Sequence, residues 1–152
     1  MSAPAIVCDN LSRWYGEVQG LAGLNVTLDQ GVFGLLGPNG SGKSTLMRLL
    51  TGQIHASRGS VKIFGETIVP GNYKPLRHIG YAVGEDVHLE SERAIDFMKM
   101  LATLGGESGK AAEQRAMKAL DFMGMADKAK VRLREMPKGM RQRVKVAQAQ
   151  LF

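Results

Sequence analysis

Residues 37–44 read Gly37-Pro38-Asn39-Gly40-Ser41-Gly42-Lys43-Ser44 and fit the pattern G-x-x-x-x-G-K-[ST]. The glycines allow the backbone to wind into a nest whose N–H groups point inward at an anion. Lys43 supplies a point charge for the β- and γ-phosphates of a nucleotide, and the Ser44 hydroxyl is a ligand for Mg²⁺. The pattern therefore predicts a phosphate-binding loop, whose nucleotide-contacting residues are Gly37, Asn39, Gly40, Ser41, Gly42, Lys43, Ser44 and Thr45.

The residues on either side of the loop support this interpretation. Residues 31–36, Gly-Val-Phe-Gly-Leu-Leu, are apolar on both faces, which predicts a buried strand of the parallel type before the loop. A helix is expected from about Lys43 to Leu50, with Leu46, Leu49 and Leu50 on one side. The positive end of that helix would add to the field that attracts phosphate. The alternative is a glycine-rich turn that contains an incidental lysine.

The composition is that of a globular protein. The chain has 152 residues, of which 44% are hydrophobic and 22% charged, so disorder is a poor interpretation. The single cysteine, Cys8, cannot form an internal disulfide, which favours a reducing compartment. No apolar segment approaches the roughly 20 residues of a membrane-spanning helix, and residues 1–4 do not begin a secretory signal. We therefore expect a soluble, cytosolic chain.

The net charge of +6 is unevenly distributed. From Gly109 to Phe152 the chain has 11 basic and four acidic residues, so this segment alone carries +7. A basic segment suits nucleic acid or an anionic membrane surface. These basic residues are spread among apolar ones rather than run together, which favours an ordinary solvated helical face.

Two parts are expected along the chain, about 1–90 and about 91–152. In the first part, short apolar runs predict strands, in addition to the one before the loop, at residues 5–9, 24–28, 61–63 and 79–82. The second of these alternates, with Leu24, Val26 and Leu28 set against polar neighbours.

In the second part, apolar residues recur at helical spacing. Ser91 is a candidate cap for a helix that ends at Gly105-Gly106. A second helix is expected from about Lys110 to Met123, with Gly124 as its stop, and a third from about Gly139 to the chain end.

The segment from Gly34 to Leu46 resembles the Walker A segment of ATP-binding cassette (ABC) ATPases almost residue for residue. Other segments resemble passages of that family in the same order, namely Arg13-Trp14-Tyr15-Gly16 with Leu21, Thr51-Gly52, Ser57–Val61 and Ile79-Gly80-Tyr81. The resemblance implies an α/β P-loop NTPase fold with an antiparallel β part and a helical part. These 152 residues would hold the N-terminal portion of a single ATP-binding domain, with an incomplete core.

The resemblance also implies the ligands ATP and Mg²⁺. Tyr15 would stack on the adenine ring, and Ser44 would coordinate Mg²⁺. The alternative for Tyr15 is an ordinary surface or core aromatic residue.

One departure from the family lies after Ile79-Gly80-Tyr81. The family's glutamine, which helps to hold Mg²⁺ and water, falls on Gly84. Glu85 follows it and could reach the metal instead, or it could lie with Asp86 in a solvated acidic loop.

A second departure lies in the signature segment, residues 136–144, which resembles the "KGMRQR" variant of the family. The residues implied to contact the ATP of an opposite subunit are Pro137, Lys138, Gly139 and Met140. Proline has neither a hydroxyl nor an N–H, so this half of the composite site is expected to be weakened.

The family's Walker B strand, catalytic glutamate and switch histidine follow the signature helix and have no match in these 152 residues. His55, His78 and His88 all precede the signature. We therefore assign no catalytic residue and expect the chain to bind ATP but not to hydrolyse it alone. We also expect the natural product to continue past Phe152, or a separate chain to supply the missing half, because a strand buried on both faces needs neighbours.

The function implied by the resemblance is that of an ATP-binding subunit of an exporter-type ABC transporter, coupling ATP binding and hydrolysis to transport. The implied partners are a membrane subunit and a second ATP-binding cassette, identical or different, at the inner face of the membrane, with no nucleic acid. The alternatives are a degenerate or truncated cassette with a regulatory role, and an ABC protein that acts on nucleic acid. A different P-loop class, such as a GTPase, is disfavoured because Asp121–Gly124 lies in a helical pattern.

Overall fold

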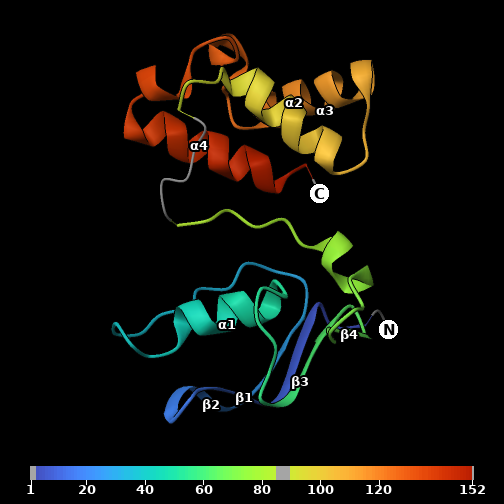
Figure 1. Ribbon diagram of the computed structural model, residues 1–152, viewed down its shortest axis with the longest axis vertical. Coiled ribbons are helices and arrows are strands. Elements are labelled where there is room, and N and C mark those ends of the chain that lie inside the picture. The colour runs from blue at the N-terminus through green and yellow to red at the C-terminus, as the bar shows by residue number, and fades with distance from the viewer. Residues whose placement is uncertain (1–2, 85–89, 152) are drawn as a thin grey trace. The chain divides into compact units, whose positions relative to one another are not determined.

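The computed structural model describes residues 3–84 and 90–151 (Figure 1). The chain divides into two compact units, Met1–Ile79 and Gly80–Phe152. The first unit contains a sheet and helix α1, and the second contains helices α2, α3 and α4. None of the helices in the described ranges has the length and apolar character needed to cross a membrane.

The sheet of the first unit is antiparallel, with the strand order β2-β1-β3-β4. Its strands are β1 (Ile6–Tyr15), β2 (Val18–Leu28), β3 (Arg58–Ile63) and β4 (Glu66–Thr67). β1 and β2 form a hairpin in which Tyr15 pairs with Val18 across the turn. The predicted strands at 5–9 and 24–28 are therefore parts of longer ones. The alternation in β2 is confirmed, because Leu24, Val26 and Leu28 are half-buried and the residues between them are exposed.

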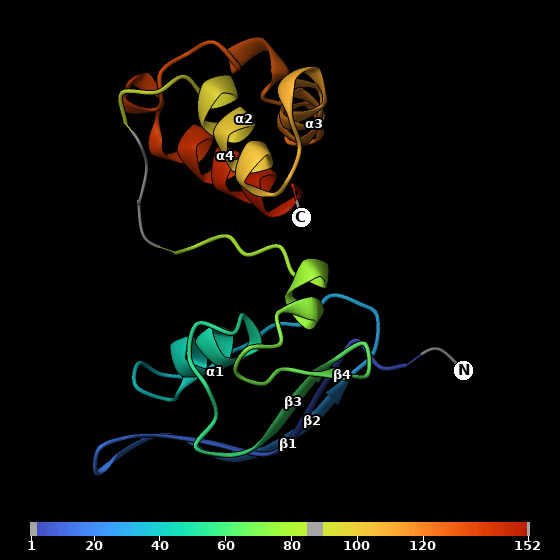
Figure 2. The same cartoon turned by 45° about the vertical axis from the view of Figure 1, so that its right-hand side comes forward.

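Helix α1 (Lys43–Leu50) lies over one face of this sheet, as both views show (Figures 1 and 2). Leu49 is buried against the sheet, and Leu46 and Leu50 pack beside it. The sheet contributes Cys8, Leu11, Val61 and Ile63 to this core. The predicted helix and its apolar side are thus confirmed.

Two predicted strands are absent from the described chain. Residues 32–38 form no strand, Val32 is fully exposed and Leu36 is 92% exposed, so the prediction of a buried strand at 31–36 is wrong. Residues 79–82 also form no strand. A parallel strand exists only through hydrogen bonds to neighbours, and no described segment pairs with either run.

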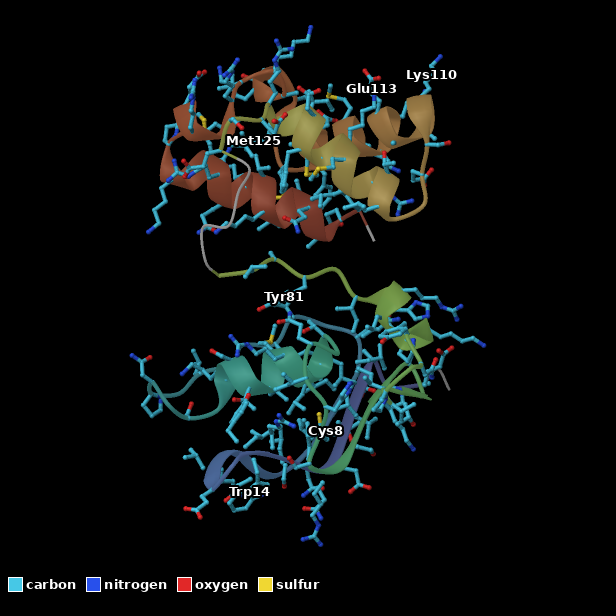
Figure 3. The ribbon with its side chains drawn as sticks, in the orientation of Figure 1. Cys8, Trp14, Tyr81, Lys110, Glu113 and Met125 are labelled. Atoms are coloured by element: carbon cyan, nitrogen blue, oxygen red, sulfur yellow. The ribbon has the colours of Figure 1, made fainter. Side chains whose placement is uncertain are left out.

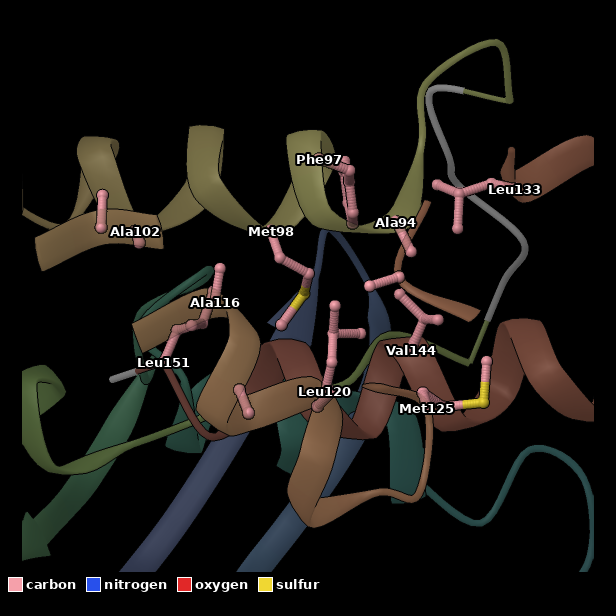
Figure 4. Packing of buried hydrophobic residues seen from close by; sticks show 14 of the residues in the cluster. Ala94, Phe97, Met98, Ala102, Ala116, Leu120, Met125, Leu133, Val144 and Leu151 are labelled. Carbon is pink, nitrogen blue, oxygen red and sulfur yellow. The ribbon is translucent and has the colours of Figure 1, made fainter. Parts of the chain in front are cut away.

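The second unit is helical. It consists of α2 (Ala94–Leu104), α3 (Gly109–Phe122) and α4 (Lys138–Ala149), with single 3₁₀ turns at Ala126–Lys128 and Leu133–Glu135. The three helices meet around a core in which Met98, Leu120 and Val144 are fully buried (Figure 4). The predicted helices are confirmed to within a residue or a few at each end.

Ser91 does not cap α2, so that prediction is wrong. The N-cap position is Arg93, and no side chain caps the helix there. The N–H groups of Ala94 and Ile95 instead donate to the carbonyls of Val131 and Ala129. Because a neighbouring segment satisfies these first donors, the helix needs no hydroxyl cap.

The basic residues of this unit mostly face solvent. Lys130, Arg132 and Arg134 are exposed, whereas the residues between them pack into the core. On α3, Lys110 and Glu113 likewise point outward (Figure 3).

Candidate nucleotide-binding site

The phosphate-type loop ends at the first residue of α1. Gly42 is the N-cap of the helix and has φ 88°, and Gly40 has φ 83°. Both are in the left-handed region, which glycine adopts without steric cost. No side chain caps α1. The first N–H groups of the helix are therefore open to an anion, and the positive end of the helix dipole lies at the same place.

The side chain of Lys43 folds back over the loop. Its Nζ donates to the carbonyl oxygens of Gly37, at 2.7 Å, and Pro38, at 2.6 Å. A longer contact, 3.4 Å, joins it to the Ser41 hydroxyl. The loop thus curls around an ammonium group, and these charge-assisted bonds hold a positive charge where the pattern places phosphate.

The β1–β2 hairpin packs directly on the loop. A Cβ on Gly42 would lie 2.6 Å from the Gly20 carbonyl oxygen and 3.3 Å from Leu21 Cδ1. Real Cβ atoms essentially never approach backbone oxygen so closely. Residue 42 must therefore be glycine for two reasons: a Cβ would overlap the Gly20 carbonyl, and φ is left-handed.

Tyr15, the predicted adenine contact, lies close to Gly20, which itself contacts the loop. A Cβ on Gly20 would lie 2.6 Å from Tyr15 Cε2 and 3.3 Å from the Thr45 hydroxyl. The Tyr15 ring and the first turn of α1 therefore both lie close to Gly20 of the hairpin. Gly20 was not among the predicted site residues, although a glycine within a strand often marks close approach of another group.

Tyr15 is 40% exposed, so this residue is accessible to a ligand. The guanidinium carbon of Arg13 lies 5.0 Å from the ring centroid, over one face of the ring. Trp14 lies between them in sequence, on the opposite side of the strand, because successive side chains alternate. Figure 3 shows Trp14 near the turn of the hairpin.

The residues present suit a magnesium ion that arrives with a nucleotide. Ser44, in the first turn of α1, offers one exposed hydroxyl. Within the described residues, no group of three or more His, Cys, Asp and Glu side chains could hold a metal ion. Mg²⁺ often binds through few protein ligands together with water and substrate phosphates, so a single hydroxyl beside a phosphate loop fits. Glu85, the other candidate ligand, lies outside the described residues.

The signature residues lie in the second unit. Pro137 is the N-cap of α4, and its carbonyl accepts bonds from the N–H groups of Met140 and Arg141. Pro137, Lys138 and Gly139 are exposed, whereas Met140 packs against the helical core. The structure therefore brings together Tyr15 and the first turn of α1 within the first unit, whereas the signature residues belong to the second unit.

Comparison with known proteins gives consistent matches along almost the whole chain. The family model described as "ABC transporter" matches residues 21–151. An uncharacterised ABC transporter ATP-binding protein of Synechocystis is 38% identical over 137 residues, which are 88% of this chain and 38% of that protein. The lipoprotein-releasing system ATP-binding protein LolD of Bacteroides fragilis is 31% identical over 147 residues, or 93% of this chain and 68% of that protein.

Solved structures show the same fold. The ADP conformation of an ATP-binding cassette of an ABC transporter superposes with a TM-score of 0.82 at 23% identity, over 99% of this chain and 65% of that one. The chain thus spans less than two thirds of this cassette and about two fifths of the Synechocystis relative. Its fold is that of a P-loop ATPase with an antiparallel β part, a helical part and an incomplete core. From the family match and the Bacteroides relative, the chain belongs to the ATP-binding proteins of ABC transporters.

Proposed function

We propose that this chain is the nucleotide-binding portion of an ABC transporter ATPase and that it binds Mg-ATP through residues 37–45 and Tyr15. The observation that carries the proposal is the Lys43 ammonium, which the loop carbonyls hold at the open N-terminus of α1. Tyr15 beside Thr45 adds an aromatic surface within reach of the same loop.

Phosphate binding would use groups that are already in place. The ammonium of Lys43 exchanges two carbonyl oxygens for phosphate oxygens, which carry full negative charge. The N–H groups at the start of α1 add further donors, and the Ser44 hydroxyl lies in the same turn. When bound, Mg²⁺ would neutralise charge between the β- and γ-phosphates.

We further propose that the chain works with a membrane subunit and a second cassette, at the cytoplasmic face of a membrane. The support is family membership together with the relatives' names, which describe ATP-binding proteins of transport systems. The "KGMRQR" signature supports an exporter. ATP would draw two cassettes together and hydrolysis would release them, shifting the membrane subunits between two states.

A degenerate cassette with a regulatory role is the second candidate, and Pro137 favours it. Pro137 occupies the N-cap of α4, where a family serine would present its hydroxyl to the opposite ATP. If this is the weak half-site, Pro137→Ser should increase Mg-ATP-dependent dimer formation, measured by light scattering. An unchanged dimer fraction would remove Pro137 as an argument for degeneracy.

The proposed function is tested by calorimetric titration of the 152-residue chain with Mg-ATP. Lys43→Ala should weaken binding at least about tenfold, because a hydrogen bond to a charged group is lost. Lys62→Ala, which removes an exposed cation from β3 in the same unit, is the matched control and should bind normally. Equal affinity of wild type and Lys43→Ala would refute the site, and a preference for GTP would favour another P-loop class.

A further inference from the structure

Arg13 contacts both the Tyr15 ring and the turn that follows α1. It lies two residues before Tyr15 on β1, so both side chains are on the same face of the strand. Its guanidinium covers one face of the Tyr15 ring, with 5.0 Å between the guanidinium carbon and the ring centroid. Its Nη1 donates to the His55 carbonyl at 3.0 Å. Arg13 therefore joins the aromatic ring to the turn that follows α1.

This turn is tied to β1 at neighbouring residues as well. The Trp14 N–H donates to the Ser57 hydroxyl at 3.1 Å, and the Ser57 N–H donates to the Ser12 carbonyl at 2.9 Å. The backbone near Arg13 is therefore anchored independently of the Arg13 side chain. Replacing that side chain should leave the strand in place.

The Nε of Arg13 is buried and has no hydrogen-bond acceptor among the described residues. A buried donor without a partner is costly, so this arrangement needs a compensating contact. The face of Tyr15 supplies one, because a cation over an aromatic ring is attracted by the ring quadrupole.

Tyr15 is thus confined on two sides. Arg13 covers one ring face, and the ring also lies close to Gly20, where a Cβ would come within 2.6 Å of Cε2. Gly20 falls between the paired residues Gln19 and Leu21, where the register of β1 and β2 shifts, so this contact is built into the hairpin. Tyr15 is still 40% exposed, and this exposed surface is available to a base.

We propose that Arg13 is a positioning residue that holds the Tyr15 ring with one face open, so that the purine of the nucleotide stacks on that face alone. The proposal rests on the proposed function, since it assumes that Tyr15 meets the base. In this proposal, Arg13 contacts neither the base nor the phosphates of the nucleotide. Its contribution is to reduce the number of ring orientations that must be lost when the base binds.

The test separates base binding from phosphate binding by using two probes, Mg-ATP and Mg-bound inorganic triphosphate. Triphosphate occupies the loop but offers nothing to Tyr15. Arg13→Met keeps a long apolar side chain and removes the cation, and it should weaken Mg-ATP binding about two- to fivefold. Mg-triphosphate binding should stay within error of wild type. Arg13→Lys keeps a cation and should lose less than Arg13→Met.

A double-mutant cycle with Tyr15→Ala tests the route of the effect. In the Tyr15→Ala background, Arg13→Met should cause no further loss of Mg-ATP affinity, because its only target is gone. Lys62→Met is the matched control for removing one cation from the same unit, and it should leave the ratio of the two affinities unchanged. If Arg13→Met fails to fold, as judged by Trp14 fluorescence, Arg13→Lys carries the same comparison with a smaller expected effect.

Several outcomes would overturn the inference. Equal weakening of both probes by Arg13→Met would show a general electrostatic or folding effect, and unchanged Mg-ATP binding would show no role. An additive cycle would mean that Arg13 acts independently of Tyr15. If Tyr15→Ala leaves Mg-ATP binding intact, the inference fails while the loop part of the proposed function stands. If wild type binds neither probe, the proposed function itself fails.

Discussion

Gly42 lies so close to Gly20 that a Cβ on Gly42 would be 2.6 Å from the Gly20 carbonyl oxygen. The N-cap of α1 is therefore in direct contact with strand β2. Tyr15 of β1 and Thr45 of α1 both lie close to the same residue, Gly20. One backbone contact joins the phosphate-type loop to the aromatic side of the candidate site.

Gly42→Ala is expected to destabilise the first unit and weaken Mg-ATP binding. The added Cβ forces a left-handed φ of 88° on alanine and also overlaps the Gly20 carbonyl. Gly71→Ala is the matched control, since Gly71 has φ 82° and open space around its Cα. We expect about 1 kcal/mol of lost stability for Gly71→Ala and at least about 1 kcal/mol more for Gly42→Ala.

The measurement is urea unfolding followed by the fluorescence of Trp14, the only tryptophan in the chain, which lies in this unit. Equal losses in the two variants would mean that the contact with Gly20 relaxes at no cost.

Pro137→Ser is expected to make α4 more stable than Pro137→Ala does. The N-cap has φ −54° and ψ 152°, and no side chain caps the helix. A serine hydroxyl there can accept a bond from an N–H of the first turn, which is worth about 1 kcal/mol relative to alanine. Both substitutions lose the rigidity of proline, so their comparison isolates the cap. Circular dichroism at 222 nm during thermal unfolding gives the difference, and identical curves for Ser and Ala would contradict it.

Cys8 is expected to make stability fall at alkaline pH. The thiol is 3% exposed on β1, and burial raises its pKa above the usual range. As pH rises through the ordinary thiol pKa of about 8.5, the unfolded chain loses this proton while the folded chain keeps it. The unfolded state then binds fewer protons, so stability decreases with pH in this window and is unaffected below it.

Urea unfolding at pH 7 and pH 9.5 should therefore show a larger alkaline loss in wild type than in Cys8→Ala. Titrations of other groups are common to both proteins and cancel in the comparison. The same alkaline loss in both would show that Cys8 keeps its proton equally in the folded and unfolded chains.

We expect the 152-residue chain to release no phosphate from ATP above the rate of its Lys43→Ala variant. Hydrolysis needs a positioned water and a fully coordinated magnesium ion. The family residues that provide them follow the signature helix and match none of residues 1–152. A colorimetric phosphate assay at high protein concentration makes the comparison, and a rate that depends on Lys43 would disprove the expectation.

The elements that could be predicted are those with local causes. The bounds of α1 agree with the prediction because apolar spacing and the glycines before Lys43 specify both its face and its start. The alternation of Leu24, Val26 and Leu28 could also be predicted from the sequence, because it depends only on the two-residue period of a strand.

The wrong predictions concern features that depend on a partner. Residues 31–36 have the composition of a buried strand, yet a strand requires hydrogen bonds from another segment, and none of the described segments supplies them. Ser91 is a good cap by type, but the carbonyls of Val131 and Ala129 already bond the first N–H groups of α2.

The sequence by itself determined the phosphate-type loop and the helix that starts at Lys43, because glycine conformations and short-range spacing are properties of a few consecutive residues. Only the tertiary structure decided that Tyr15 and Thr45 flank Gly20, and that Arg13 covers the Tyr15 ring. These contacts depend on the register of the β1–β2 hairpin and on the packing of α1 against it. A shift of one residue in that register would turn the side chains of Arg13 and Tyr15 to the opposite face of the sheet.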